Sequence, residues 1–148
     1  MMNFENLQHD LFKKKLEDWR SMYFSNPTRT INVATLFSGI GAIEHALDRL
    51  NIGHKIVFAG DIDKHVKDSY LANYDIGECD WHNDITSFDA KPYKDQVDLL
   101  VGGSPCQAFS MVGKRLGLDD TRGTLFYDFA RVVNEVKPKV FIYENVKG

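Results

Sequence analysis

The sequence predicts an α/β fold, namely a Rossmann-like parallel sheet with helices on both faces. Two observations predict it: short apolar runs alternate with longer amphipathic runs, and the last short run, Val140–Tyr143, is apolar throughout. Strand–helix alternation builds a parallel sheet, because each helix crosses one face before the next strand begins. A strand that is apolar on both sides is typical of a buried position in such a sheet.

The expected elements follow one another in chain order. Residues 4–23 have the spacing of an amphipathic helix that packs on the main domain, and Ser25–Thr28 interrupts that pattern as a linker. Strands are then expected at 31–37, 56–59, 97–101 and 140–143, with a weak short strand near Trp81. Helices are expected at 42–50, 64–73 and 124–136, and Pro138 stops the last one. The chain thus divides into a helix with linker at 1–30 and an α/β domain at 31–148.

Composition narrows the class of protein. The 148 residues suit one domain of ordinary size, and 43% hydrophobic with 26% charged residues is typical of a soluble globular protein. No segment approaches the roughly 20 apolar residues that span a membrane. Only two cysteines, Cys79 and Cys106, favour a reducing cytoplasm over an oxidising compartment. Because the net charge is -3, the overall charge does not indicate a nucleic-acid partner.

A glycine turn follows the first expected strand. Gly39 and Gly41 let the backbone turn tightly and approach a ligand, and the next helix presents free N–H groups. A dinucleotide site has a third glycine three residues later, where this chain has Glu44. A carboxylate there would face a pyrophosphate badly, so the turn favours a ligand such as S-adenosylmethionine. A plain strand–helix turn accounts for the two glycines equally well.

Two later strand ends carry acidic residues beside apolar ones. Asp61 lies twenty residues after the second glycine, close to the spacing at which an acid accepts hydrogen bonds from ribose hydroxyls. Ile62 beside it suits an adenine face, and Asp63 is the more natural helix N-cap, which leaves Asp61 available. At the third strand end, Asp84 either accepts from an adenine amino group, with Ile85 beside the ring, or serves as a turn residue.

A lone cysteine follows the fourth expected strand. A lone cysteine is more often a buried core residue, but Cys106 stands just beyond the strand end, where parallel sheets bind their ligands. Glu144 follows the last expected strand, which should lie beside the fourth. The two side chains are therefore expected to converge. A thiol and a carboxylic acid beside a nucleoside cofactor indicate covalent catalysis.

From Val33 onward the chain resembles the DNA (cytosine-5)-methyltransferase family, in its N-terminal catalytic portion. The resemblance lies in Leu36–Gly41, Gly60–Asp63, Asn83–Ile85, Gly103–Ser110, Gly113–Arg115, Asp120–Phe126 and Glu144–Val146. Order and spacing agree across the set, and the Pro-Cys-Gln block paired with Glu-Asn-Val is highly specific. Thr35 stands where the family usually has Asp, and Ala42 where Gly is common. Neither departure falls on a position that carries the chemistry.

The resemblance implies transfer of a methyl group from S-adenosyl-L-methionine to C5 of a flipped-out cytosine in double-stranded DNA. Cys106 would add to C6 of the base, and Glu144 would hydrogen-bond or protonate N3. The cofactor would contact Phe37, Gly39, Gly41, Asp61, Ile62, Asp84, Ile85, Gly103, Pro105 and Leu125. The DNA would contact Gln107, Ser110, Lys114, Arg115 and Arg122, in a loop that closes over it. No metal is expected, because the cluster at Cys79 and His82 holds too few ligands.

The resemblance also implies a methyltransferase fold that stops after its fifth strand and lacks the target-recognition half. A cytoplasmic protein of bacterial or phage origin, in a restriction-modification setting, is expected. The strand at 140–143 would then be an unprotected sheet edge, which we expect to pair with a complementary chain or a second copy. An inactive fragment, one subunit of a split enzyme and a tRNA cytosine methyltransferase remain alternatives. Glu44 and the turn around Cys106 count against a nicotinamide-dependent oxidoreductase.

Overall fold

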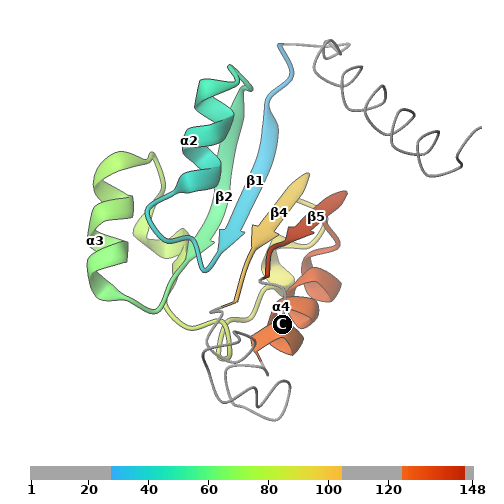
Figure 1. Cartoon of the computed structure of the whole chain (residues 1–148). Coiled ribbons are helices and arrows are strands. Elements are labelled where there is room, and N and C mark those ends of the chain that lie inside the picture. The colour runs from blue at the N-terminus through green and yellow to red at the C-terminus, as the bar shows by residue number, and fades with distance from the viewer. Residues whose placement is uncertain (1–27, 105–124, 146–148) are drawn as a thin grey trace, which may run out of the picture.

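A computed structural model describes residues 28–104 and 125–145, which form a five-stranded parallel sheet with helices on both faces (Figure 1). The elements are β1 (Ile31–Leu36), α2 (Ala42–Arg49), β2 (His54–Gly60), α3 (Lys64–Asn73), η1 (Glu78–Asp80), β3 (Trp81–His82), η2 (Lys91–Tyr93), β4 (Leu99–Gly102), α4 (Leu125–Val136) and β5 (Val140–Tyr143). The strand order is β3-β2-β1-β4-β5. The predicted fold class is confirmed, whereas the helix predicted at 4–23 lies outside the described residues.

Most element boundaries agree with the sequence pattern. Helix α3 begins at Lys64 because the Asp63 side chain accepts a hydrogen bond from the His65 N–H at 2.7 Å, which confirms the predicted N-cap. Strand β2 begins two residues earlier than expected, because His54 already pairs with Ile31 of β1. The first two residues of β2, His54 and Lys55, are polar, so a search for apolar runs does not include them.

The sheet separates two apolar layers. Side chains alternate between the faces of a strand, so Leu36 of β1 packs with Leu100 and Phe129 on the α4 face. On the opposite face Tyr70 of α3 packs with Trp81. Figure 1 shows the same arrangement, with α2 and α3 on one side of the sheet and α4 on the other. Packing on both faces fixes the positions of the strands, and so the positions of their carboxyl ends.

All five strands end along one row. The register pairs Leu36 of β1 with Gly60 of β2 and with Gly102 of β4. Gly60 in turn pairs with His82 of β3, and Gly102 with Tyr143 of β5. The segments that follow these residues therefore leave the sheet side by side. In an open parallel sheet, this carboxyl edge is where ligands bind.

Strand β5 is an apolar edge strand within the described part of the chain. Phe141 contacts the ring of Phe129 in α4, so the alternating residues Val140 and Ile142 point to the other face of the sheet. Val140, Phe141 and Ile142 are 56%, 55% and 51% exposed. This exposure agrees with the expectation of an unprotected edge, and pairing with another chain stays a prediction.

Asp98 ties together the amino ends of β1, β4 and β5. Its carboxylate accepts the Asn32 N–H at 2.8 Å and a hydrogen bond from the Lys139 ammonium at 2.5 Å. The Asn32 N–H, followed by Lys139, holds the pKa of Asp98 below its usual value. A lowered pKa means that the folded state binds the Asp98 proton more weakly than the unfolded state. The stabilisation is present above about pH 4 and is lost as the pH falls through the lowered pKa.

We therefore expect Asp98→Asn to reduce the loss of stability between pH 7 and pH 3 by about 1 kcal/mol, a value discounted for partial exposure. Urea unfolding at the two pH values measures it. The matched control is Asp75→Asn, which changes an exposed aspartate. Equal pH dependence in wild type and Asp98→Asn would contradict the assignment.

Candidate functional site

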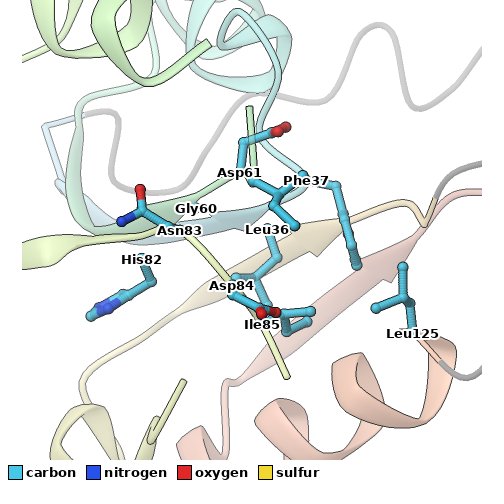
Figure 2. A pocket seen from close by; sticks show the side chains of 10 residues that line it. Leu36, Phe37, Gly60, Asp61, His82, Asn83, Asp84, Ile85 and Leu125 are labelled. Carbon is cyan, nitrogen blue, oxygen red and sulfur yellow. The ribbon is translucent and has the colours of Figure 1, made fainter. Parts of the chain in front are cut away.

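A cavity of about 130 Å³ lies at the carboxyl ends of β1, β2 and β3 (Figure 2). Six of the residues predicted to bind the cofactor line it: Phe37, Asp61, Ile62, Asp84, Ile85 and Leu125. They come from three different strand ends and from the first residue of α4. In Figure 2, Phe37 and Leu125 lie at one end of the cavity, and His82 and Asn83 at the other. Apolar walls with two carboxylates suit a ligand that combines a flat ring with hydroxyl or amino groups.

Asp61 is held in place by two backbone amides. Its Oδ2 accepts the Gly39 N–H at 3.1 Å, and its Oδ1 accepts the Asp63 N–H at 3.0 Å. The sequence reasoning left Asp61 without a structural role, and in this respect it was incomplete. A carboxylate offers about four acceptor positions, so two amides leave capacity for ligand hydroxyls. The two amides fix the orientation of the Asp61 carboxylate and therefore the direction of its free lone pairs.

Asp84 is a turn residue that also lines the cavity. Its Oδ1 accepts hydrogen bonds from the Thr86 hydroxyl at 2.8 Å and the Thr86 N–H at 2.9 Å, as a turn residue does. These two bonds, the hydroxyl first, hold the pKa of Asp84 below its usual value. Asp84 also lines the cavity. It is therefore an ionised turn residue that faces the site.

Helix α4 fastens the wall of the cavity that Ile85 forms. Ile85 is buried, and its carbonyl accepts a hydrogen bond from the Arg131 guanidinium at 2.5 Å. The same guanidinium donates to the Phe88 carbonyl at 2.9 Å. Asp128 and Glu135, one turn before and after it on α4, flank Arg131 at 3.4 and 3.2 Å. The segment that follows β3 is thus anchored to α4.

The two glycines of the first turn do not line this cavity. Both have positive φ, +54° at Gly39 and +82° at Gly41. A Cβ on Gly41 would lie 2.2 Å from the ring of Tyr74, whose hydroxyl donates to the Gly41 carbonyl at 2.8 Å. The described structure thus requires glycine at position 41 for the backbone conformation and for Tyr74. Contact of either glycine with the cofactor stays a prediction.

The Glu44 carboxylate does not face the turn, which corrects the argument made from sequence. Glu44 is fully buried, with Oε1 at 2.8 Å from the Thr35 hydroxyl and 2.5 Å from the Tyr70 hydroxyl. Three positions along α2, Leu47 is buried on the same side of the helix. Glu44 therefore points between sheet and helices. Its charge gives no reason to exclude a diphosphate ligand from the turn.

Sequence reasoning missed four lining residues: Leu36, Gly60, His82 and Asn83. They stand at or next to the last position of a strand, so the signal was available in the expected strand ends. The His82 ring stacks on Phe88 with centroids 3.8 Å apart, and its Nε2 lies 3.0 Å from the Tyr93 hydroxyl. Burial lowers the pKa of His82, which favours the neutral ring. His82 thus secures the end of β3.

Glu144 lies against the backbone that follows β4. Its N–H donates to the Gly102 carbonyl at 2.9 Å, which confirms that the fourth and fifth strand ends are neighbours. A Cβ on Gly103 would lie 3.0 Å from Oε2 of Glu144. Buried Ser104, next along the chain, bonds through its hydroxyl to Tyr143 at 2.5 Å. The described chain therefore runs beside Glu144 to a point two residues before the predicted nucleophile.

The remaining predicted residues lie outside the described residues, and they are Pro105, Cys106, Gln107, Ser110, Lys114, Arg115 and Arg122. Cys79, the other cysteine, is exposed and lies next to Asp80, with 3.6 Å between sulfur and carboxylate. Among the helices that the structure describes, none is long and apolar enough to cross a membrane.

Known proteins resemble this chain over most or all of its length. Residues 31–148 match the family of C-5 cytosine-specific DNA methylases. The chain is 45% identical to the orphan methyltransferase M.SPRI of Bacillus phage SPR over 80% of its length, which is 27% of the phage protein. It is 41% identical to the type II methyltransferase M.Eco47II of Escherichia coli over its whole length, which is 34% of that protein. The chain spans about a third or less of these relatives.

Solved structures agree with the sequence relatives. The crystal structure of S. pombe Dnmt2 methyltransferase superposes with a TM-score of 0.61 at 30% identity, covering 80% of this chain and 37% of that one. The Entamoeba histolytica methyltransferase EhMeth shares the fold, with a TM-score of 0.64 at 20% identity, covering 80% and 39%. Since the family match covers most of the sequence, the chain belongs to the C-5 cytosine-specific DNA methylase family.

Proposed function

We propose that this chain forms the cofactor pocket and supplies the nucleophile of a DNA (cytosine-5)-methyltransferase that uses S-adenosyl-L-methionine. The observation that carries the proposal is the cavity shared by Asp61, Asp84 and the apolar residues around them. It adjoins the strand ends where Glu144 lies against Gly103. Membership of the methylase family supports the same reaction.

The cavity suits the nucleoside part of the cofactor. Asp61, oriented by two amides, would accept hydrogen bonds from the ribose hydroxyls. Asp84 would accept from the adenine amino group, between Ile62 and Ile85 as apolar neighbours of the ring. The contacts proposed to complete the site come from Phe37, Gly39, Gly41, Gly103, Pro105 and Leu125. The bound cofactor would supply a methyl group on a positively charged sulfur.

The chemistry that we assign to the protein activates the cytosine ring. The Cys106 thiolate would form a bond to C6 while Glu144 hydrogen-bonds N3, so that electrons move from the C5–C6 bond toward the ring nitrogen. C5 then becomes nucleophilic enough to take the methyl group. Loss of the C5 proton restores the double bond and releases the Cys106 sulfur. Glu144 is suitably placed because it follows β5 directly, beside the chain that leads to Cys106.

Double-stranded DNA is the proposed substrate, because the family acts on DNA. A cytosine inside a duplex must leave the base stack to reach Cys106, which costs a few kcal/mol. The polar and basic residues proposed to contact the DNA are Gln107, Ser110, Lys114, Arg115 and Arg122. The two sequence relatives named above come from a bacterium and a bacterial phage, so we propose the bacterial cytoplasm and a restriction-modification setting.

The part of a methyltransferase that this chain does not span would complete the enzyme. Among the described residues, the exposed apolar residues of β5, Val140 to Ile142, offer an unpaired parallel edge to another strand. We propose that the occupant belongs to the part of a methyltransferase that this chain does not span, and that a second copy is the alternative. Analytical ultracentrifugation of the chain with and without that part distinguishes the two, and a lone monomer in both would contradict pairing.

Transfer of labelled methyl groups tests the function. The chain, alone and mixed with the complementary part of a methyltransferase, is incubated with labelled S-adenosyl-L-methionine and either duplex DNA or tRNA. We expect 5-methylcytosine in the DNA of the mixture. Labelled methyl groups in tRNA but not in DNA would show that the substrate is RNA. No labelled product in any mixture would refute the proposal.

Asp61→Ala is expected to weaken cofactor binding by at least about tenfold, because it removes the acceptor for the ribose and the bond to the Gly39 N–H. Isothermal titration calorimetry with S-adenosyl-L-methionine measures the effect. Asp63→Ala is the matched control: it removes the N-cap of α3, and Asp63 does not line the cavity. Equal weakening by both variants would show that Asp61 acts only through stability.

A further inference from the structure

Glu44 is a buried acid that the proposed reaction does not use. Its side chain is fully inaccessible, and Oε1 accepts hydrogen bonds from the hydroxyls of Thr35 in β1 and Tyr70 in α3. Oε2 is equally buried and has no hydrogen-bond partner among the described residues. A buried carboxyl group with an unpaired oxygen costs folding free energy that an apolar side chain would not. Stability alone therefore does not explain a glutamate at this position.

One of these bonds leads to the glycine turn. The Thr35 oxygen lies 2.8 Å from Glu44 Oε1 and 3.0 Å from the Ser38 hydroxyl oxygen. A hydroxyl group has one proton to donate. When Thr35 donates that proton to Glu44, its lone pairs face Ser38, which can then donate to Thr35. Glu44 thereby fixes the direction of the Thr35 hydroxyl and leaves the Thr35 lone pairs for Ser38, and bonds aligned in this way strengthen one another.

Ser38 connects this chain to the cavity. Its hydroxyl accepts the Gly60 N–H at 3.0 Å, and its own N–H donates to the Gly60 carbonyl at 3.0 Å. Gly60 lines the cavity, and the next residue, Asp61, accepts the Gly39 N–H. Ser38 thus joins the first turn to the end of β2 through both its side chain and its backbone. The Ser38 hydroxyl also lies 3.1 Å from the carbonyl oxygens of Thr35 and Gly60, so its orientation affects the bonds on both segments.

We infer that Glu44 is a positioning residue for the cofactor site, acting through Thr35 and Ser38 on the turn that holds Gly39 and Asp61. The inference rests on the proposed function, since it assigns the turn to S-adenosyl-L-methionine. The other bond of Glu44 leads to Tyr70, which packs on Trp81 with ring centroids 5.1 Å apart. That branch joins α2 to α3. The Tyr70 ring also packs on Tyr74, whose hydroxyl donates to the Gly41 carbonyl, but this contact uses the ring of Tyr70 and not its hydroxyl.

The two branches allow a matched pair of variants. Thr35→Val keeps the shape of a buried strand residue and removes the link from Glu44 to Ser38. Tyr70→Phe keeps the ring and removes the other hydroxyl from the same carboxyl oxygen. We expect Thr35→Val to raise the dissociation constant of S-adenosyl-L-methionine about tenfold and Tyr70→Phe to change it less than about twofold. Glu44→Leu should resemble Thr35→Val, and Glu44→Gln, which keeps an acceptor oxygen, should restore binding.

Amide hydrogen exchange on the chain without cofactor gives an independent measurement. The amides of Gly39 and Gly60 donate to Asp61 and Ser38, so we expect them to exchange about tenfold faster in Thr35→Val and unchanged in Tyr70→Phe. Equal exchange in the two variants, or no change in either, would overturn the inference. If the wild type fails to bind the cofactor, the proposed function fails, and exchange still decides whether Glu44 positions the turn.

Discussion

Cys106→Ala is expected to reduce methyl transfer by the completed enzyme at least about a thousandfold. Without the thiolate, C6 of cytosine gains no electron pair and C5 stays too weak a nucleophile to take the methyl group. The matched control is Cys79→Ala, which removes the exposed cysteine beside Asp80 and should leave transfer unchanged. Labelled methyl incorporation into DNA measures both variants.

A trapping experiment separates catalysis from binding. When fluorine replaces the C5 hydrogen of the target cytosine, C5 has no proton to lose after methyl transfer, so elimination is blocked and the Cys106–C6 bond persists. We expect the wild type to form a DNA complex that survives denaturation, and Cys106→Ala to form none. A persistent complex with Cys106→Ala would place the nucleophile elsewhere.

Glu144 should matter for the rate more than for folding. Glu144→Gln keeps the backbone bond from residue 144 to the Gly102 carbonyl but removes the transferable proton, so transfer should fall about a hundredfold or more. An unchanged unfolding midpoint would accompany this loss.

Phe129→Ala is expected to cost about 3–5 kcal/mol of stability, a large share of the total for one domain. Phe129 is buried in α4, and its ring contacts Phe141 and Tyr143 of β5 with centroids 6.4 and 5.0 Å apart. Its ring also fills the space beside Gly102, where a Cβ would lie 2.6 Å away. Removing it opens a cavity under the strand ends that carry Glu144.

Urea unfolding measures this cost, with Tyr127→Ala as the control on the same helix. Tyr127 is 55% exposed, so its truncation should cost about 1 kcal/mol or less. Equal costs would mean that Phe129 does not anchor β5.

Much of the fold followed from local pattern. Short apolar runs marked the strands, and Asp63 marked the start of α3, because an N-cap needs only the backbone amides that follow it. The acidic residues at two strand ends, Asp61 and Asp84, were found by the same means, since the carboxyl edge of a parallel sheet collects whatever follows its strands. The family resemblance and its chemistry also rest on residues that are close in sequence.

Only the tertiary structure decided what each side chain touches across elements. Glu44 points into the interior rather than at the turn, because Thr35 and Tyr70 receive it there, and neither partner is near it in sequence. Position 41 requires glycine because a Cβ would meet the ring of Tyr74, the residue that follows α3. Sequence by itself determined which residues leave the sheet at the functional edge. Packing between distant elements determined their direction, because hydrogen bonds and ring contacts form only once the layers have met.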